Sequence, residues 1–282
     1  MRLALIQMAS GPRLEENLSR AEAYIETAGK QGAQVLLLPE LFFTPYMGPV
    51  EREELFELAH PLQSHPWLFR FQELSRRYQA FIPVSFFERA GPVFYNSVAV
   101  FLQGELAGLY RKSHIPDGPG YEEKFYFAPG DTGFRTWSTP WGEIGVAICW
   151  DQWFPEAARI MALKGADLLV YPSTIGSEPP EAGGLETREL WRRVMVGHAV
   201  ANAVYVAAVN RVGEERWGRK RQRYYGASFA VDYQGELLVE AGEEEGIFWA
   251  ELDLAKARRF RAGMGFFRDR RPDLYGLLSG KR

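Results

Sequence analysis

Three chemically reactive side chains each stand directly after an apolar run that has the composition of a β-strand. Glu40 follows QVLLLP, Lys112 follows GELAGLYR, and Cys149 closes EIGVAIC. Functional groups in α/β sheets gather beyond the carboxyl ends of strands, so we expect these three to share one rim. A carboxylate directly after an apolar run is costly to desolvate unless it is paired or used. Taken singly, Glu40 could be an exposed turn residue, Lys112 a surface charge and Cys149 a filler of the core.

Together, a thiol, an ammonium and a carboxylate support hydrolysis through a covalent intermediate. The thiolate is the nucleophile, and we expect Lys112 and the N-terminus of a helix near Pro155 to lower the pKa of Cys149. Lys112 would also stabilise the oxyanion that forms on attack, assisted by a backbone N–H after Cys149. Glu40 would take the thiol proton, pass it to the departing amine and later activate water.

A cysteine–histidine protease is an alternative use of a cysteine nucleophile. The chain has 4 histidines. His60, His65 and His114 lie in polar or proline-flanked loops and His198 lies within a predicted helix, so none has the position expected of a base. The single cysteine excludes a disulfide within the chain and a zinc site of several cysteines.

Strand-like and helix-like segments alternate along the chain and would position these groups. Residues 34–38 form an apolar run typical of a strand buried on both faces, and residues 14–32 have helical spacing. The other predicted strands are 3–8, 81–86, 97–101, 144–148, 168–171, 204–209, 227–231 and 246–252, and the other predicted helices are 67–77, 155–164 and 186–202. The alternation, without repeats or a Ser/Gly linker, predicts one α/β domain over residues 1–282.

The composition is that of an ordinary globular protein. Hydrophobic residues make up 46% and charged residues 24%, and the net charge is −3, so nucleic acid and anionic membranes are not expected partners. No apolar stretch is long enough to span a bilayer, and LALIQMAS near the start is typical of a strand rather than a secretory leader. We therefore expect a cytoplasmic location. The basic residues between 256 and 271 favour a solvated helix or a subunit contact over a nucleic-acid patch.

Three motifs resemble those of the nitrilase, or carbon–nitrogen hydrolase, superfamily. They are PELFFTPY at 39–46, YRKSHIPDGPGYEEKFYFAPGDTGF at 110–134 and GVAICWDQWFPEAAR at 145–159, and the likeness extends over nearly the whole chain. The resemblance implies a four-layer αββα sandwich, homo-oligomers built from dimers, and no cofactor or metal. It also implies that Glu40, Lys112 and Cys149 are the catalytic triad. Glu123 matches an additional glutamate that positions substrate and water, whereas the neighbouring Glu122 is more often Gln in relatives.

The residues after Cys149 favour one group within that superfamily. Relatives that hydrolyse N-carbamoyl amino acids place arginines there to hold the substrate carboxylate, whereas this chain has Gln152 and Trp153. The likeness is greatest to N-carbamoylputrescine amidases. It implies hydrolysis of a small molecule, N-carbamoylputrescine, to putrescine, ammonia and carbon dioxide in polyamine biosynthesis.

The substrate site is expected to combine aromatic faces with one carboxylate. Such a lining suits an alkylammonium tail. The expected lining residues are Tyr46, Trp150, Trp153, Phe154, Ser173 and Glu178. The plain alternative for Glu178 is a solvent-exposed loop residue.

Two other functions stay open from the sequence. One is a β-ureidopropionase-like or aliphatic amidase activity on another small amide or ureide. The other is a binding or scaffold protein that keeps the fold without catalysis, against which the intact set of Glu40, Lys112 and Cys149 argues.

Overall fold

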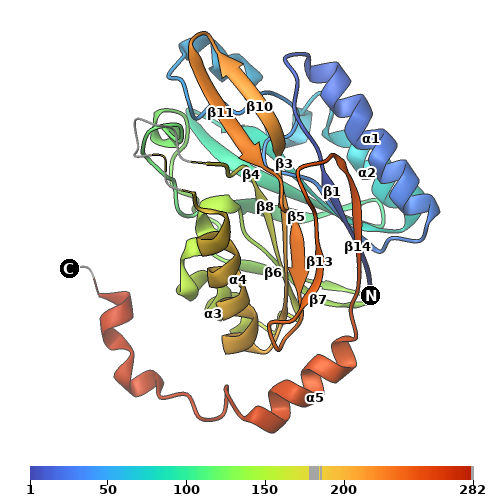
Figure 1. Ribbon diagram of the computed structural model, residues 1–282, viewed down its shortest axis with the longest axis vertical. Coiled ribbons are helices and arrows are strands. Elements are labelled where there is room, and N and C mark those ends of the chain that lie inside the picture. The colour runs from blue at the N-terminus through green and yellow to red at the C-terminus, as the bar shows by residue number, and fades with distance from the viewer. Residues whose placement is uncertain (178–183, 185, 281–282) are drawn as a thin grey trace.

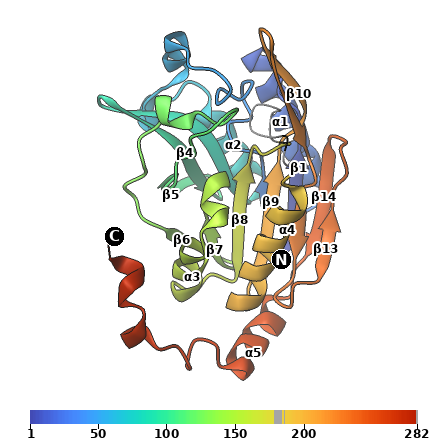
Figure 2. The ribbon, with the colours of Figure 1, turned by 60° about the vertical axis from the view of Figure 1, so that its left-hand side comes forward.

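Two facing β-sheets form the centre of the computed structural model, which describes residues 1–177, 184 and 186–280. Helices cover the outer face of each sheet (Figures 1 and 2), so the four layers confirm the expected αββα sandwich. Within the described residues the first sheet runs in the order β14 (Gly246–Glu251), β1 (Arg2–Gln7), β2 (Val35–Leu37), β3 (Phe81–Ala90), β4 (Val93–Leu102) and β5 (Glu105–Arg111). The second runs in the order β13 (Leu237–Glu240), β12 (Phe229–Val231), β9 (Tyr205–Asn210), β8 (Leu168–Ser173), β7 (Gly142–Val146) and β6 (Arg135–Thr139).

The central strands are apolar along their middle, as Leu3–Ile6 of β1 shows, because both of their faces are covered. In β1, Leu3 and Leu5 belong to the core between the sheets, whereas Ala4 and Ile6 belong to the core under the helices. Side chains of a strand alternate between its two faces, so a run without polar residues fits a strand between two apolar layers. The parallel pairing of Leu3 with Val35 continues this arrangement into β2.

The helices bury one face each. Helices α1 (Leu14–Lys30) and α2 (Leu68–Tyr78) pack together on the first sheet, and α3 (Pro155–Leu163) and α4 (Arg188–Asn202) pack together on the second (Figures 1 and 2). In α1 the buried face includes Leu18, Ala21 and Ile25, which have the spacing predicted from the sequence. Short 3-10 helices are η1 (Glu53–Leu58), η2 (Leu62–Ser64), η3 (Glu123–Phe125), η4 (Cys149–Trp153), η6 (Pro272–Leu274) and η7 (Gly276–Ser279).

The C-terminal part of the chain leaves the sandwich. Helix α5 (Leu254–Met264) begins at Asp253, whose side chain accepts a hydrogen bond from the backbone N–H of Lys256. Its Arg258 and Arg261 bind the buried Asp167, so the basic cluster lies partly on a helix, as expected. Beyond α5 the chain continues as an arm (Figures 1 and 2), in which Phe267 packs against the core beside Arg159 of α3 and residues 271–280 are exposed.

The sequence did not predict the hairpin of β10 (Val212–Trp217) and β11 (Lys220–Tyr225). Its strands are rich in charged residues, and they pair with each other along their length, with one further bridge between Tyr224 and Gly176. They therefore lack the apolar runs that mark strands of the two main sheets. Figure 1 shows this hairpin rising beyond the sheets, over the end where the site lies.

Strand directions bring the expected rim together. Strand β2 is parallel to β3, and β4 is antiparallel to both β3 and β5, so β2 and β5 end at the same edge of the first sheet. Strand β7 is parallel to β8 and β9 in the second sheet. Glu40 follows β2, Lys112 follows β5, and Cys149 follows β7.

Candidate active site

The ammonium of Lys112 lies between two carboxylates. Its Nζ is 2.8 Å from Oε1 of Glu40 and 2.8 Å from each carboxylate oxygen of Glu123. All three side chains are completely buried. Burial alone lowers the pKa of Lys112, but the adjacent Glu123 and Glu40 raise it above its ordinary value, so the amine stays protonated.

The two oxygens of Glu40 have different surroundings. Oε1 accepts hydrogen bonds from Lys112 at 2.8 Å and from Nδ2 of Asn96 at 2.7 Å. Oε2 is buried and has no hydrogen-bond partner among the described residues. A buried carboxylate oxygen without a donor is costly, and here it leaves a lone pair available to take a proton.

Glu123 is held from two sides. Besides Lys112, the hydroxyl of Tyr46 donates to its Oε1 at 2.5 Å. Burial raises the pKa of Glu123 to about 7, with Lys112 opposing and Glu40 adding to the rise. Glu123 therefore exchanges a proton near neutral pH. The predicted Tyr46 is itself fully buried and joins this cluster through its hydroxyl.

Cys149 lies in a strained turn between a strand and a short helix. It begins η4 and has a φ of 40°, in the left-handed region that residues with a Cβ rarely adopt. Its side chain is buried, and its Sγ lies 3.8 Å from the carbonyl oxygen of Thr174. Strain of this kind at a reactive residue is typical of a functional turn.

The expected lowering of the thiol pKa is wrong. Burial and the carboxylate of Glu40 raise the pKa of Cys149 well above its ordinary value, although Lys112 acts in the lowering direction. The helix α3 begins at Pro155, and η4 lies between it and the cysteine. A raised pKa favours the neutral thiol, so a nucleophilic role for Cys149 would need a base to remove its proton during attack.

A buried aspartate, not singled out from the sequence, braces the cysteine turn. Oδ2 of Asp151 accepts from the backbone N–H of Ile148 at 3.1 Å and from the hydroxyl of Tyr110 at 2.6 Å. Oδ1 lies 2.9 Å from the backbone N–H of His114 and 2.7 Å from its Nδ1. Tyr110 and His114 flank Lys112, so one carboxylate links the turn of the thiol to the segment of the ammonium.

The histidines do not serve the thiol. The ring of His114 stacks on Phe154 with centroids 3.6 Å apart, and His198 bonds the backbone carbonyl oxygen of Gln152. Within the described part of the chain, no hydrogen bond joins a histidine to Cys149. This arrangement argues against a catalytic cysteine–histidine pair.

The residues expected to bind substrate are only partly brought together. Trp150 is 38% exposed beside Cys149, and its ring meets that of the half-buried Trp153. The hydroxyl of Ser173 is buried and donates to Oε1 of Gln152 at 3.0 Å, whereas Nε2 of Gln152 is buried without a hydrogen-bond partner among the described residues. Phe154 stacks on a histidine, as above. Glu178 lies outside the described residues.

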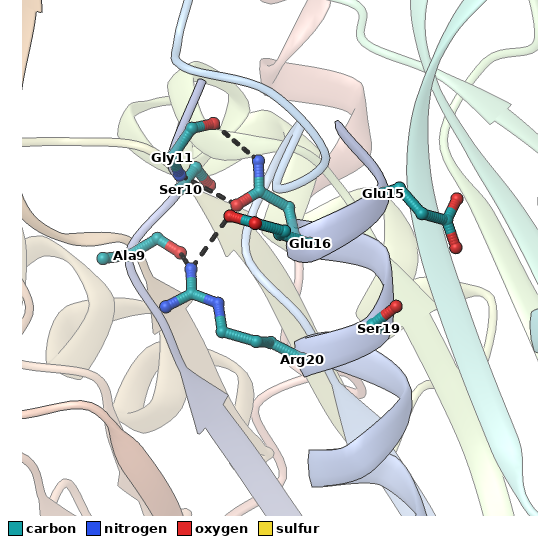
Figure 3. A pocket seen from close by; sticks show the side chains of 8 residues that line it. Ala9, Ser10, Gly11, Glu15, Glu16, Ser19 and Arg20 are labelled. Carbon is teal, nitrogen blue, oxygen red and sulfur yellow. Dashed lines mark hydrogen bonds between the residues drawn. The ribbon is translucent and has the colours of Figure 1, made fainter. Parts of the chain in front are cut away.

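A separate surface pocket lies at the start of α1 (Figure 3). Arg20 donates to the carbonyl oxygen of Ala9 there, and Asn17 exchanges hydrogen bonds with the backbone of Gly11. None of its lining residues belongs to the cluster around Lys112. No group of three or more acidic, histidine or cysteine side chains in the described ranges could hold a metal ion. The helices described are all too short or too polar to cross a membrane.

Comparison with known proteins gives consistent matches over the full length. A model of the carbon–nitrogen hydrolase family matches residues 2–262. The chain is 50% identical to the N-carbamoylputrescine amidase of Solanum tuberosum, over 98% of this chain and 94% of that protein. It is 43% identical to the citrullinase of Francisella tularensis, over 100% and 99% of the two chains. The crystal structure of a carbon–nitrogen hydrolase from Helicobacter pylori superposes with a TM-score of 0.91 at 37% identity, covering 100% of this chain and 99% of that chain.

Proposed function

The chain belongs to the carbon–nitrogen hydrolase family, and we propose that it hydrolyses N-carbamoylputrescine with Cys149 as nucleophile. The observation that carries the chemistry is the Lys112 ammonium held 2.8 Å from Glu40, whose other oxygen has no partner among the described residues. The choice of N-carbamoylputrescine as substrate is supported by the 50% identity to an N-carbamoylputrescine amidase. The reaction converts the ureide and one water into putrescine, ammonia and carbon dioxide.

The first half of the reaction forms a covalent intermediate. Sγ of Cys149 attacks the ureido carbon as Oε2 of Glu40 takes the thiol proton. The carbonyl oxygen becomes an oxyanion, which Lys112 and the backbone N–H of Trp150 stabilise. Glu40 then gives its proton to the departing nitrogen, and a carbamoyl-enzyme remains.

The second half releases the carbamoyl group. Water enters, Glu40 takes one of its protons, and the resulting nucleophile attacks the thiocarbamate carbon. Both oxygens of Glu123 accept from Lys112, so Glu123 keeps the ammonium oriented through both halves. Collapse of the second tetrahedral intermediate returns the proton to the thiol and releases carbamic acid, which breaks down to ammonia and carbon dioxide.

The test of this proposal is ammonia release from two ureides that differ by one carboxylate. N-carbamoylputrescine and citrulline share the ureido group and the carbon chain, but citrulline also carries an α-carboxylate. Citrulline is the second candidate because of the 43% identity to a citrullinase. We expect a higher kcat/KM for N-carbamoylputrescine, and a higher value for citrulline would replace the first substrate by the second. A preference for N-carbamoyl-β-alanine would favour the β-ureidopropionase-like alternative.

The cationic tail of the substrate would be bound by Glu178. A carboxylate there would attract an ammonium and repel a carboxylate. We expect Glu178→Gln to raise KM for N-carbamoylputrescine about tenfold or more, with less effect on kcat, because the contact exists in ground and transition states alike. An unchanged KM would assign tail recognition to other residues.

The same protein is proposed to form homo-oligomers in the cytoplasm. Helices α3 and α4 expose Ile160, Leu163, Leu190 and Val200 on the outside of the second sheet. Large apolar side chains gathered on one packed pair of helices fit an interface with a second copy.

A further inference from the structure

Arg211 is a completely buried charge placed behind the loop that carries Glu40. It follows strand β9, and its side chain is 0% exposed. It does not touch Lys112 or Cys149 by any hydrogen bond given for the described residues. A buried guanidinium is costly unless its donors are used, so its partners show what it does.

The Nη donors of Arg211 are used by the backbone of one loop and by Glu215, whereas its Nε has no hydrogen-bond partner among the described residues. Nη2 donates to the carbonyl oxygens of Glu40 at 3.1 Å and Leu41 at 2.7 Å, and Nη1 donates to that of Thr44 at 2.9 Å. Arginine presents its N–H groups in a rigid planar fork, which fixes the relative positions of the groups that it binds.

This loop needs support because its backbone is strained. Leu41 has a φ of 47°, in the left-handed region that a leucine rarely adopts. Its backbone N–H is held by Oγ of Ser85 at 3.0 Å, and its carbonyl by Arg211. A strained residue directly after Glu40 turns the chain and aims the carboxylate toward Lys112.

The partner of Arg211 extends the support to Tyr46. Oε1 of Glu215 accepts from Nη1 of Arg211 at 2.5 Å, and its Oε2 accepts from the backbone N–H of Tyr46 at 2.6 Å. The hydroxyl of Tyr46 in turn reaches Glu123. One buried ion pair therefore fixes the backbone from Glu40 to Tyr46.

We propose that Arg211 is a positioning residue for the reaction, which sets the orientation of Glu40 and, with Glu215, that of Tyr46. The proposal rests on the proposed roles of Cys149 as nucleophile and Glu40 as base. A positioning role predicts that loss of the guanidinium lowers kcat even in a variant that folds as wild type does.

The test compares Arg211→Lys with a matched control, Arg258→Lys. Lysine keeps the charge beside Glu215 but loses the planar fork, whereas Arg258 binds the buried Asp167 far from the site. With both proteins folded, we expect Arg211→Lys to lower kcat for N-carbamoylputrescine at least about tenfold and to change KM about twofold at most. The control should keep kcat within about twofold of wild type. Retention of the wild-type kcat by folded Arg211→Lys would overturn the proposal.

Alkylation of Cys149 by iodoacetamide separates this proposal from the choice of substrate. Because Glu40 accepts the thiol proton, its misplacement should slow alkylation in Arg211→Lys as it does in Glu40→Gln, and change its pH profile. This comparison holds even where wild type fails to hydrolyse the ureide, an outcome that overturns the proposed function alone. An alkylation rate and pH profile equal to those of wild type would refute the positioning role.

A double variant decides the matter where Arg211→Lys does not fold. Arg211→Met with Glu215→Leu removes both charges, so no buried charge is left unpaired. A folded double variant with a kcat at least about tenfold below wild type supports positioning, because the loop has lost its fork. Wild-type kcat in that variant would overturn it.

Discussion

One oxygen of Glu40 accepts from two donors and the other has no hydrogen-bond partner among the described residues, and this asymmetry suits a base. The oxygen bound by Lys112 and Asn96 fixes the carboxylate, and the other is available to the thiol. A base of this kind works on a neutral thiol, which is the form that the raised pKa of Cys149 favours. In the proposed mechanism the nucleophile is therefore activated during attack rather than beforehand.

Substitution of Glu40 and Cys149 tests this division of labour. Glu40→Gln keeps shape and hydrogen bonding but cannot take a proton, so we expect kcat to fall at least about a hundredfold. Cys149→Ala should remove turnover while the fold is kept, and Cys149→Ser should be nearly inactive because a hydroxyl is much harder to deprotonate. Steady-state ammonia release measures each variant.

Asp167→Asn is the control for the loss of a buried carboxylate. Asp167 binds Arg258 and Arg261, away from the thiol. The folded control should turn over at the wild-type rate. Wild-type activity in Glu40→Gln would move the proton transfer to another group, with Glu123 the next candidate.

The titration of Glu123 predicts a pH dependence of stability. Its pKa is raised from 4.5 to about 7 in the folded protein. Between these values the native carboxyl keeps a proton that the unfolded chain has lost, so the native state binds more protons and stability falls as pH rises. The loss is complete above pH 7 and amounts to at most about 3 kcal/mol.

Urea unfolding of wild type and Glu123→Gln at pH 5 and at pH 8 measures this effect. Glutamine does not titrate, so the variant lacks this contribution. We expect the free energy of unfolding of wild type to fall relative to that of the variant at the higher pH. If the free energy of unfolding changed equally with pH in the two proteins, the group that titrates near neutral pH would not be Glu123.

At the scale of elements, Asp151 couples the short helix η4 to the end of β5. Its two oxygens accept from the backbone of Ile148 and from Tyr110 and His114. Asp151→Asn replaces one carboxylate oxygen by an NH2 group, which then faces N–H or O–H donors and cannot accept their hydrogen bonds. We expect a loss of about 2–3 kcal/mol in the free energy of unfolding and a lower kcat in the protein that folds.

The matched control for this brace is Asp253→Asn. Asp253 caps α5 through the backbone N–H of Lys256, and asparagine is also a good helix cap. Urea unfolding should show a change of less than about 0.5 kcal/mol in the free energy of unfolding of the control. Equal effects of the two substitutions would mean that Asp151 has no special role in holding the turn.

The elements that the sequence predicted are those with one clear period. Helix α1 has apolar residues at helical spacing, and strands β1 and β2 are continuous apolar runs; each lies where expected. The hairpin of β10 and β11 was missed because its residues are largely charged and its strands pair mainly with each other. Only the end of β11, at Tyr224 and Tyr225, joins the apolar cores.

The rule that a functional polar residue directly follows an apolar strand identified some residues of the site and missed others. Glu40, Lys112 and Cys149 were found because each polar group follows an apolar strand. Arg211 also follows an apolar strand, β9, but it lies 171 residues from Glu40 in the sequence, so its contact with that loop cannot be read locally. Asn96 and Asp151 were missed for the same reason, since their partners come from other strands.

At the scale of the molecule, exposed apolar side chains gather away from the site. The arm after α5 exposes Leu274, Leu277 and Leu278, the second of them by 86%. Together with α3 and α4, it offers apolar surface that a second copy would cover. The single-domain and cytoplasmic assignments stay predictions.

Sedimentation of Leu163→Glu tests the assembly. Leu163 lies on α3 and is 45% exposed, so a charge there should weaken an interface on that face. We expect wild type to sediment as a dimer or larger and the variant to dissociate at higher concentration. The control is Phe69→Glu on α2, an exposed apolar residue over the other sheet. Sedimentation of wild type as a monomer would contradict the proposed homo-oligomer.

The protonated, buried state of Cys149 also decides how the protein withstands oxidants. Peroxide attacks thiolates that solvent can reach, whereas burial raises the pKa of this thiol and leaves only 5% of the residue exposed. We therefore expect hydrogen peroxide to convert Cys149 to its sulfenic acid more slowly than it oxidises a free cysteine in solution at the same pH.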